Sequence, residues 1–184
     1  MSGETWVFGY GSLIWKPGFD FAERRLAVLP GYRRSFCMAS MRYRGTPEAP
    51  GLVLALDREP GAQCVGVAYR IATEASAGTV AYLRERELIA YAYNEERLPV
   101  ALGDGEVVEA ICYVMNREHP QYRGGLSLEA QAEVIARAAG PMGPNVEYLM
   151  NTVAGLAALG LDDPDLSMLA DLVQQRSAAQ TGGK

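Results

Sequence analysis

The chain has 184 residues, a hydrophobic fraction of 49% and a formal net charge of −5 at pH 7. This length suits a single domain over residues 1–184 that buries a sizeable core. No apolar run is long enough to cross a bilayer, and the interspersed charges form no basic stripe that would bind nucleic-acid phosphates. We therefore expect no membrane and no nucleic acid as partners, and a small molecule as the ligand.

The compartment is indicated by the first residues and by the cysteines. The chain passes from Met1 almost directly into a strand-like run, without the basic start and apolar stretch of a secretory signal. Cys37, Cys64 and Cys112 are odd in number, contain no CxxC pair and lie in β-like apolar runs. We expect a cytoplasmic protein with reduced thiols.

Short β-like runs dominate the first two thirds of the chain, and Gly and Pro separate them. The runs are Thr5–Phe8, Leu26–Leu29, Arg34–Ala39, Leu52–Leu56, Cys64–Ile71, Leu98–Leu102 and Val107–Met115. Turns are expected at Pro30-Gly31, Pro60-Gly61 and, as a tight hairpin, Gly103-Asp104-Gly105, among others. Their spacing predicts a barrel or a strongly curved sheet.

Helical periodicity appears in one internal segment and throughout the C-terminal third. The predicted helices are Glu74–Glu87 with Thr73 as N-cap, a run from the N-cap Ser127 through Ala138, Asn145–Leu159, and Asp165–Arg176. The small, polar residues 177–184 read as a frayed tail. Strands first and helices later imply an α+β domain.

The sequence lacks the motifs of several large enzyme classes. His119 is the only histidine, so a Ser-His-Asp triad would have to use this one residue, and a zinc site would lack histidine ligands. No GxxxxGK[ST] occurs, and Gly9-Tyr10-Gly11 lacks the third glycine of a dinucleotide fingerprint. We expect neither a metal nor a cofactor.

A glycine-bearing turn follows the first apolar strand, in Tyr10-Gly11-Ser12-Leu13. Glycine lets a ligand approach the main chain, and N–H groups turned inward there would form a nest for a carboxylate or an oxyanion. Tyr10, Gly11, Ser12 and Leu13 are therefore candidate substrate-binding residues. By pattern alone, an ordinary strand-ending turn is the alternative.

A charged cluster, Arg84-Glu85-Arg86-Glu87, ends the predicted internal helix. Such a run is most often a solvated helix face. Glu87, however, lies four residues after Leu83 and seven after Val80, on the face those residues would turn toward the core, whereas Glu85 faces the other side. A carboxylate against apolar walls has a raised pKa, which suits a catalytic base and acid near neutral pH.

Other polar and aromatic residues have simpler readings. Tyr69 and Tyr113 lie in predicted strands, where packing explains them. Tyr148 is either core or points its hydroxyl at a ligand. Arg42 and Arg44, beside a turn, could bind a carboxylate, although surface arginines are common.

The string Val7-Phe-Gly-Tyr-Gly-Ser-Leu-Ile-Trp-Lys-Pro-Gly-Phe19 closely resembles the opening of ChaC-like γ-glutamyl cyclotransferases. Further matches follow at Gly31–Arg34, Tyr43–Gly51, Gly66–Arg70, Tyr82–Glu87, His119–Tyr122 and Asn145–Leu149. The resemblance covers about Trp6–Arg176. It implies a small β-barrel flanked by helices and a cofactor-independent cyclotransferase reaction.

Carried over by motif, Glu87 resembles the catalytic glutamate, Tyr10–Leu13 the loop for the γ-glutamyl group, and Tyr148 a tyrosine near the substrate. The sequence departs from some members at Leu88-Ile89-Ala90 and at Tyr43, which bears on substrate preference. The resemblance implies glutathione as substrate, with 5-oxoproline and cysteinylglycine as products. Other γ-glutamyl peptides or amines, or a non-catalytic ligand-binding regulator of ion transport, are the alternatives.

Overall fold

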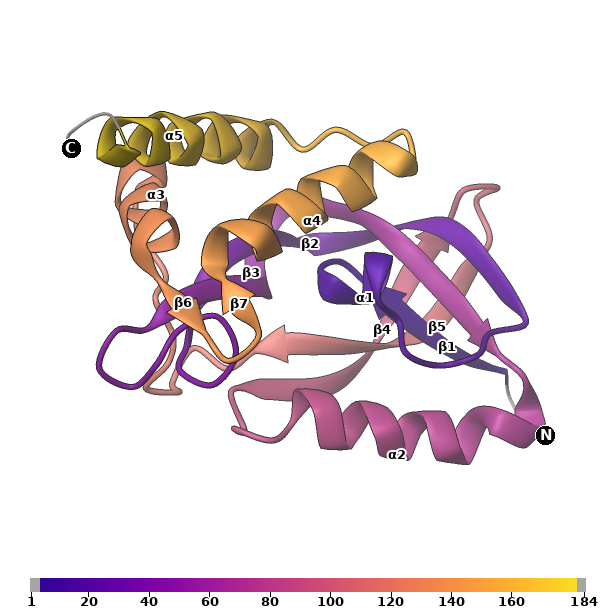
Figure 1. Cartoon of the computed structure of the whole chain (residues 1–184). Helices are drawn as coiled ribbons and strands as arrows, with labels where there is room; N and C mark the ends of the chain where they lie inside the picture. The colour runs from indigo at the N-terminus through magenta and orange to yellow at the C-terminus, as the bar shows by residue number, and fades with distance from the viewer. Residues whose placement is uncertain (1–3, 182–184) are drawn as a thin grey trace. The chain divides into compact units, whose positions relative to one another are not determined.

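The computed structural model describes residues 4–181, and its main feature is a closed barrel of strands in the order β1-β3-β2-β4-β5 (Figure 1). The strands are β1 (Thr5–Gly9), β2 (Glu23–Ser40), β3 (Gly51–Ile71), β4 (Tyr93–Leu102) and β5 (Val107–Met115). Strand β1 pairs antiparallel with β3 and parallel with β5. The expected barrel is confirmed.

Three helical segments lie between the barrel strands in sequence, and the other three follow them. The helices are α1 (Ser12–Trp15), the 3-10 turn η1 (Thr73–Ala75), α2 (Ser76–Glu87), α3 (Leu128–Arg137), α4 (Asn145–Ala158) and α5 (Pro164–Thr181). A two-stranded sheet of β6 (Ala139–Gly140) and β7 (Gly143–Pro144) lies between α3 and α4. The α+β class is confirmed.

The fold divides into two compact units. The first comprises the chain up to Ser35 together with Ala55–Pro120, and the second comprises Phe36–Leu54 together with the chain from Gln121 onward. The first unit therefore holds β1, β4, β5 and most of β2 and β3 with α1 and α2, and the second holds the end of β2, the start of β3 and the helices α3, α4 and α5. That the whole chain is one domain stays a prediction.

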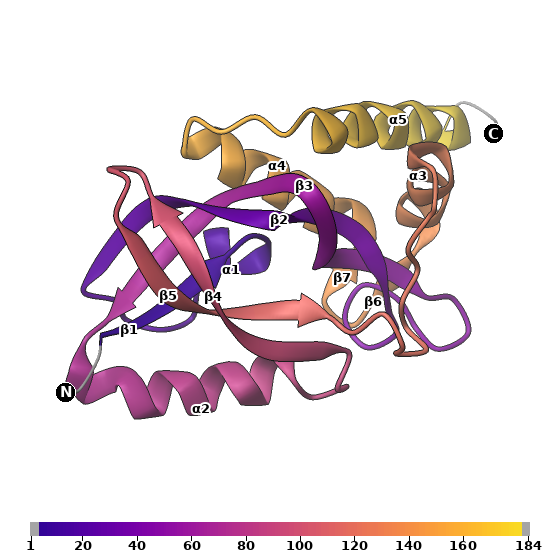
Figure 2. The ribbon, with the colours of Figure 1, turned by 180° about the vertical axis from the view of Figure 1, so that it is seen from behind.

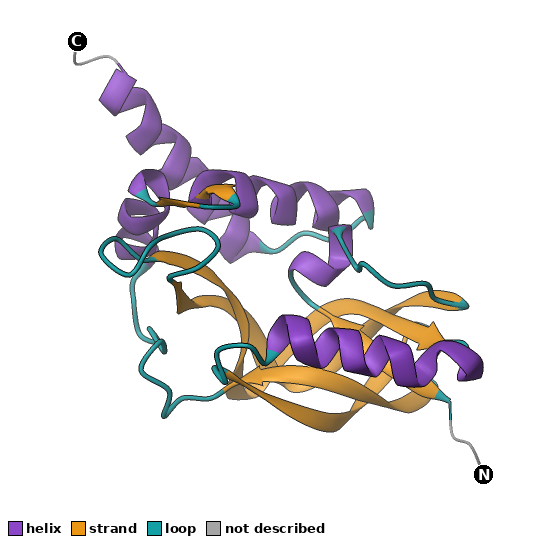
Figure 3. Cartoon of the chain, turned by 60° about the horizontal axis from the view of Figure 1, so that its bottom comes forward, coloured by secondary structure: helices purple, strands orange, loops and turns teal. Residues whose placement is uncertain are grey.

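In the first unit, β1 is buried on both of its faces. Val7 and Phe8 are neighbours in a strand, so their side chains point to opposite faces, yet both are fully buried. Helix α2 runs alongside the barrel strands, as Figures 2 and 3 show from different sides. It begins beside β1, where Thr5 Oγ1 lies 2.6 Å from Ser76 Oγ, and it turns Leu83 inward with no exposed surface.

In the second unit, the three C-terminal helices pack on one another and on the ends of β2 and β3. Ile135, Leu149 and Val173, one from each helix, are fully buried. The Asn145 side chain donates to Leu52 O at 2.7 Å and accepts from Leu52 N at 2.7 Å. The amide of the first residue of α4 thus satisfies both main-chain groups of Leu52 on β3, as a neighbouring strand would.

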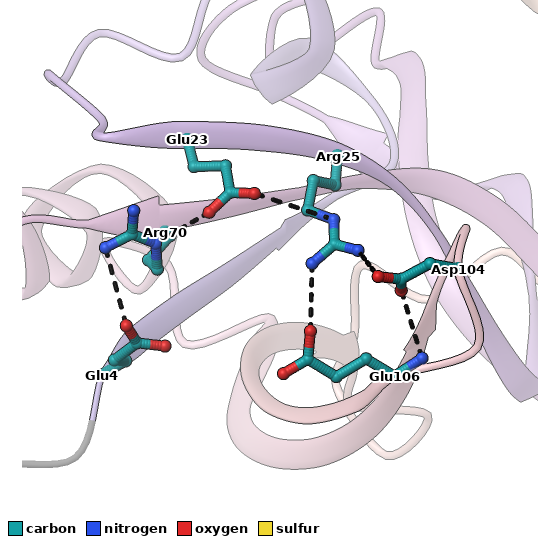
Figure 4. Close-up of polar contacts among 6 residues, drawn as sticks. All are labelled: Glu4, Glu23, Arg25, Arg70, Asp104 and Glu106. Carbon is teal, nitrogen blue, oxygen red and sulfur yellow. Dashed lines mark hydrogen bonds and ion pairs between the residues drawn. The ribbon is translucent and has the colours of Figure 1, made fainter.

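Charged side chains tie the rim of the barrel together (Figure 4). Arg70 donates to Glu23 at 2.9 Å, and Arg25 donates to Glu106 at 3.0 Å and pairs with Asp104. The remaining ion pairs join Arg70 to Glu4 and Arg25 to Glu23. These groups are partly exposed, and water screens their charges, so each pair contributes little to stability.

Two of the expected turns, at Pro30-Gly31 and Pro60-Gly61, do not separate two strands, so this prediction is wrong. Strands β2 and β3 continue through Pro30-Gly31 and Pro60-Gly61, where Gly31 and Gly61 have φ of +80° and +87°. Glycine adopts positive φ without steric cost, so these dipeptides bend each strand without ending it. The expected hairpin at Gly103-Asp104-Gly105 is confirmed between β4 and β5.

Some of the predicted helix ends are confirmed and others are wrong. The end of α2 at Glu87 and the N-cap Ser127, whose side chain accepts from Ala130 N, are confirmed. The Thr73 cap is wrong, because Thr73 begins η1 and Ala75 precedes α2 without a side-chain cap. The frayed tail is wrong for residues 177–181, which extend α5, and its last three residues lie outside the described chain.

Two observations concern the environment of the protein. None of the helices within residues 4–181 is both long and apolar enough to cross a membrane. Cys37, Cys64 and Cys112 are buried, and no disulfide joins them.

The close approach of β3 to β1 predicts that Gly66 does not tolerate a side chain. A Cβ at Gly66 would meet Gly9 O and would lie 2.8 Å from Phe8 Cζ, inside the barrel core. We expect Gly66→Ala to lower the free energy of unfolding by about 1 to 3 kcal/mol, as overpacking does. Urea denaturation followed by circular dichroism measures it.

Gly78→Ala is the matched control, because Gly78 is exposed on α2 and a Cβ there would meet nothing within 4 Å. An alanine in a helix interior is about 0.5 to 1 kcal/mol more favourable than glycine, so this variant should be more stable than the wild type. Equal stability of Gly66→Ala and the wild type would contradict the packing described here.

Candidate active site

The turn after β1 is held by side chains of the barrel. Tyr69 on β3 donates its hydroxyl to Leu13 O at 2.8 Å, and Arg34 on β2 donates to Tyr10 O at 2.6 Å. Tyr10 donates to Tyr113 O on β5 at 3.0 Å. These bonds fix the main chain of the turn from three strands, and they point the buried Tyr10 side chain into the barrel.

Ser12 begins the short helix α1, and its start leaves main-chain donors available. Ile14 N is the first amide to bond back, to Gly11 O at 2.9 Å. Within residues 4–181 the amides of Ser12 and Leu13 make no backbone hydrogen bond, as expected for the leading N–H groups of a helix. These amides and the half-buried Ser12 hydroxyl could receive an oxyanion or a carboxylate.

Glu87 is the last residue of α2, and its side chain is turned toward the protein. Only 16% of the side chain is exposed, Leu83 one turn earlier is fully buried, and Glu85 is exposed. The face predicted from the sequence is therefore confirmed. Burial raises the pKa of Glu87, and the positive charge of Arg86 lowers it in part. A carboxyl group with this balance can both accept and return a proton.

Arg86 joins the helix that carries Glu87 to the turn that carries Ser12. Its Nη1 lies 2.9 Å from Lys16 O, 3.0 Å from Pro17 O and 3.2 Å from Tyr82 Oη, while Nη2 donates to Ser12 Oγ at 2.9 Å. Its Nε forms an ion pair of 3.2 Å with Glu87 Oε1. One guanidinium thus brings the acid and the turn, which are far apart in sequence, to a common point.

Tyr113 on β5 adds a buried hydroxyl close to the acid. Burial raises its pKa, and so do the charges of Glu95 and Glu87. Its hydroxyl donates to Glu95 at 3.3 Å, and Glu95 is held by Arg84 at 2.7 and 2.8 Å. The prediction that Tyr69 and Tyr113 serve packing is therefore incomplete, because both hydroxyls also bond to groups of this site.

Tyr148 lies on α4, in the second unit. Its hydroxyl accepts from Leu54 N at 3.3 Å, and its ring packs edge-on to Phe36 at 5.8 Å between centroids. The guanidinium of Arg44 lies 5.9 Å from the ring centroid. A role for Tyr148 beside Glu87 stays a prediction.

Sequence reasoning missed Arg34 and Arg86. A signal existed for Arg86, since it adjoins Glu87 and lies one helical turn after Tyr82, a spacing at which side chains meet. No comparable signal marked Arg34. Within residues 4–181, no group of three or more His, Cys, Asp or Glu side chains could hold a metal ion.

Comparison with known proteins gives consistent matches. A family model described as ChaC-like protein matches residues 5–176. The chain is 38% identical to the glutathione-specific gamma-glutamylcyclotransferase of Escherichia coli (strain K12), over 91% of this chain and 71% of that one. It is 31% identical to glutathione-specific gamma-glutamylcyclotransferase 1 of Homo sapiens, over 91% and 78% respectively.

The fold has a solved counterpart as well. A crystal structure of a gamma-glutamyl cyclotransferase specific to glutathione from yeast superposes with a TM-score of 0.85. It is 26% identical in sequence, and the match covers 95% of this chain and all of that one. From the family match and these identities together, the chain belongs to the ChaC-like protein family.

Proposed function

We propose that this protein is a γ-glutamyl cyclotransferase that cleaves glutathione into 5-oxoproline and cysteinylglycine in the cytoplasm, without a cofactor. The observation that carries the proposal is the buried Glu87 carboxyl, tied through Arg86 to the turn at Ser12. The names of the bacterial, human and yeast relatives support glutathione as the substrate. Incubation of the purified protein with glutathione, followed by assay of both products, tests it.

The reaction needs no second substrate. The α-amine of the γ-glutamyl group attacks its own γ-carbonyl carbon and forms the C–N bond of a five-membered lactam, and the original peptide C–N bond breaks. Holding the reacting atoms of one molecule together can contribute about 7 to 11 kcal/mol to lowering the barrier. Folding the γ-glutamyl chain into a ring-closing shape is therefore the main task of the site.

Proton transfer is the task of Glu87. The carboxylate accepts a proton from the substrate ammonium, which frees the nitrogen lone pair for attack, and then returns a proton to the departing nitrogen. The attacking nitrogen gives up a second proton as the lactam forms, and the released amine gains one as it leaves in the ammonium form, so the number of protons on the enzyme is the same before and after. A pKa raised by burial suits both steps, because the group is basic enough to accept and acidic enough to donate.

The turn at Ser12 supplies donors for negative charge. The amides of Ser12 and Leu13 and the Ser12 hydroxyl would bind the substrate carboxylate or the oxyanion that forms at the γ-carbonyl. Tyr10 and Gly11 contribute through the main chain, since the Tyr10 side chain is directed inward.

Two alternatives differ in their products. An enzyme for other γ-glutamyl peptides or amines would also release 5-oxoproline, and a substrate panel separates it from a glutathione-specific one. A ligand-binding regulator of ion transport would release none. The buried acid favours catalysis, because a binding module has no need to keep a carboxyl group away from water.

Glu87→Gln is expected to lower kcat with glutathione by about 10² to 10⁴-fold, because the amide has nearly the same shape but cannot accept the proton. The affinity for glutathione, measured by calorimetry, should change little. The release of 5-oxoproline measures turnover.

Glu85→Gln is the matched control, two residues away on the same helix and exposed. It should retain the wild-type rate. Near-normal turnover by Glu87→Gln would remove Glu87 from the mechanism.

The raised pKa of Glu87 also predicts how stability depends on pH. The folded state holds this proton more tightly than the unfolded state, in which the pKa is near 4.5. The contribution of Glu87 is therefore fully present below that value and is lost as pH rises through the folded pKa. Glu87→Gln lacks this loss, so its stability relative to the wild type should increase with pH and then level off. Urea denaturation at a series of pH values measures it, and a difference independent of pH would contradict burial of the carboxyl.

A further inference from the structure

The guanidinium of Arg86 has partners on all three of its nitrogens. Only 21% of its side chain is exposed. Nη1 donates to the main chain after α1 and to the Tyr82 hydroxyl, and Nη2 donates to Ser12 Oγ. Nε forms an ion pair with Glu87. An exposed arginine on a solvated helix face would not be engaged on every nitrogen, so this residue has a specific structural task.

The bond from Arg86 determines what the Ser12 hydroxyl can do. Guanidinium has no acceptor, so Ser12 Oγ must be the acceptor of this hydrogen bond. The hydroxyl proton is then free of this bond, and no second hydrogen bond of Ser12 Oγ is found among residues 4–181. A hydroxyl that accepts from a cation is also a stronger donor, because the charge polarises it. Arg86 thereby leaves the Ser12 hydroxyl proton available for donation.

The same cation acts on the Glu87 carboxyl. Nε lies 3.2 Å from Oε1, and its charge opposes the effect of burial on the pKa of Glu87. Two other titratable groups lie nearby. Tyr113 on β5 has a raised pKa, and Glu95 on β4 forms an ion pair with Arg84 that compensates its negative charge. Arg86 is therefore the positive charge that directly stabilises the ionised form of Glu87.

The loop between α1 and β2 is shaped to receive this arginine. Gly18 has φ of +77°, and a Cβ there would collide with the Tyr82 hydroxyl and approach Arg86 Nη1 to 3.4 Å. Tyr82 and Arg86 are one turn apart on α2, so their side chains lie on the same face of the helix. Both occupy the space that a side chain at position 18 would need. A lysine has a single nitrogen and cannot reach Ser12, the loop carbonyls and Glu87 at once.

We propose that Arg86 is a positioning residue for the cyclotransferase reaction: it orients the Ser12 hydroxyl as a donor to the substrate and holds the Glu87 carboxylate in place beside it. The inference rests on the proposed function of Glu87 as the proton-transfer group. It adds that one side chain, Arg86, positions both the Glu87 carboxylate and the Ser12 hydroxyl, so a change at Arg86 affects both groups.

The test is the pH dependence of kcat/KM in Arg86→Gln, Arg86→Lys and the control Arg137→Gln. Arg137 is an exposed arginine on α3 that pairs with Glu133 at 3.1 Å and makes no contact with Glu95, Tyr113 or Glu87. In Arg86→Gln, the acid limb should move to higher pH, because Glu87 loses its neighbouring charge, and kcat at neutral pH should fall by about 10²-fold from misplacement of the reacting groups. In Arg137→Gln, the limb should stay in place.

Arg86→Lys separates the two effects of the residue. It keeps the charge, so its acid limb should move less than that of Arg86→Gln, but its kcat should remain low because one ammonium cannot orient both groups. It also serves as the test if Arg86→Gln does not fold, as judged by circular dichroism. An acid limb unchanged in Arg86→Gln, or wild-type kcat in Arg86→Lys, would overturn the proposal.

A double-mutant cycle tests the coupling to Ser12. If Arg86 acts through the hydroxyl, Ser12→Ala and Arg86→Lys together should lower kcat much less than the product of their separate effects. Multiplicative effects would show that Arg86 does not orient Ser12. These outcomes are distinct from failure of the proposed function, in which the wild-type protein itself would release no 5-oxoproline from glutathione.

Discussion

The constraint on which the site depends is the placement of one carboxyl group where it is least stable as an anion. Glu87 is largely removed from water, and it stands at the C-terminal end of α2, where the helix dipole presents negative charge. Both effects favour the protonated form. The fold keeps the group there by packing Leu83 beneath the same face and by placing Arg86 against the carboxylate.

The barrel provides the rigid side of the site. Tyr69 and Arg34 bond to the carbonyls of the turn from strands that are themselves paired on both sides, so the turn has little freedom to move independently of the sheet. Helix α2 is a separate element, and its end reaches the turn through the bond from Arg86 to Ser12. Precise placement of the acid relative to the donors therefore depends on the contact between two elements, not on either element itself.

The sequence predicted those features that arise from local pattern. Periodicity was sufficient to place the end of α2 at Glu87 and to turn its side chain inward, and the strand-like runs were sufficient for a barrel. The continuity of β2 and β3 through their Pro-Gly pairs was not predictable, because positive φ at glycine is compatible with either a turn or a bend. Nor was the partnership of Arg86 with Ser12, since these residues are 74 positions apart and meet only in the folded chain.

The balance of charges around Glu87 matters because the proposed reaction uses the same group twice. Burial without a neighbouring cation would keep the carboxyl protonated and unable to take the proton from the substrate ammonium. A strong, fully formed salt bridge would hold it ionised and make it a poor donor to the departing nitrogen. An ion pair from a guanidinium whose other nitrogens are already engaged by the loop and Ser12 lies between these limits. The pKa of Glu87 stays raised although Arg86 lies against the carboxylate, so burial outweighs the guanidinium charge, and the group keeps a proton affinity suited to use first as a base and then as an acid.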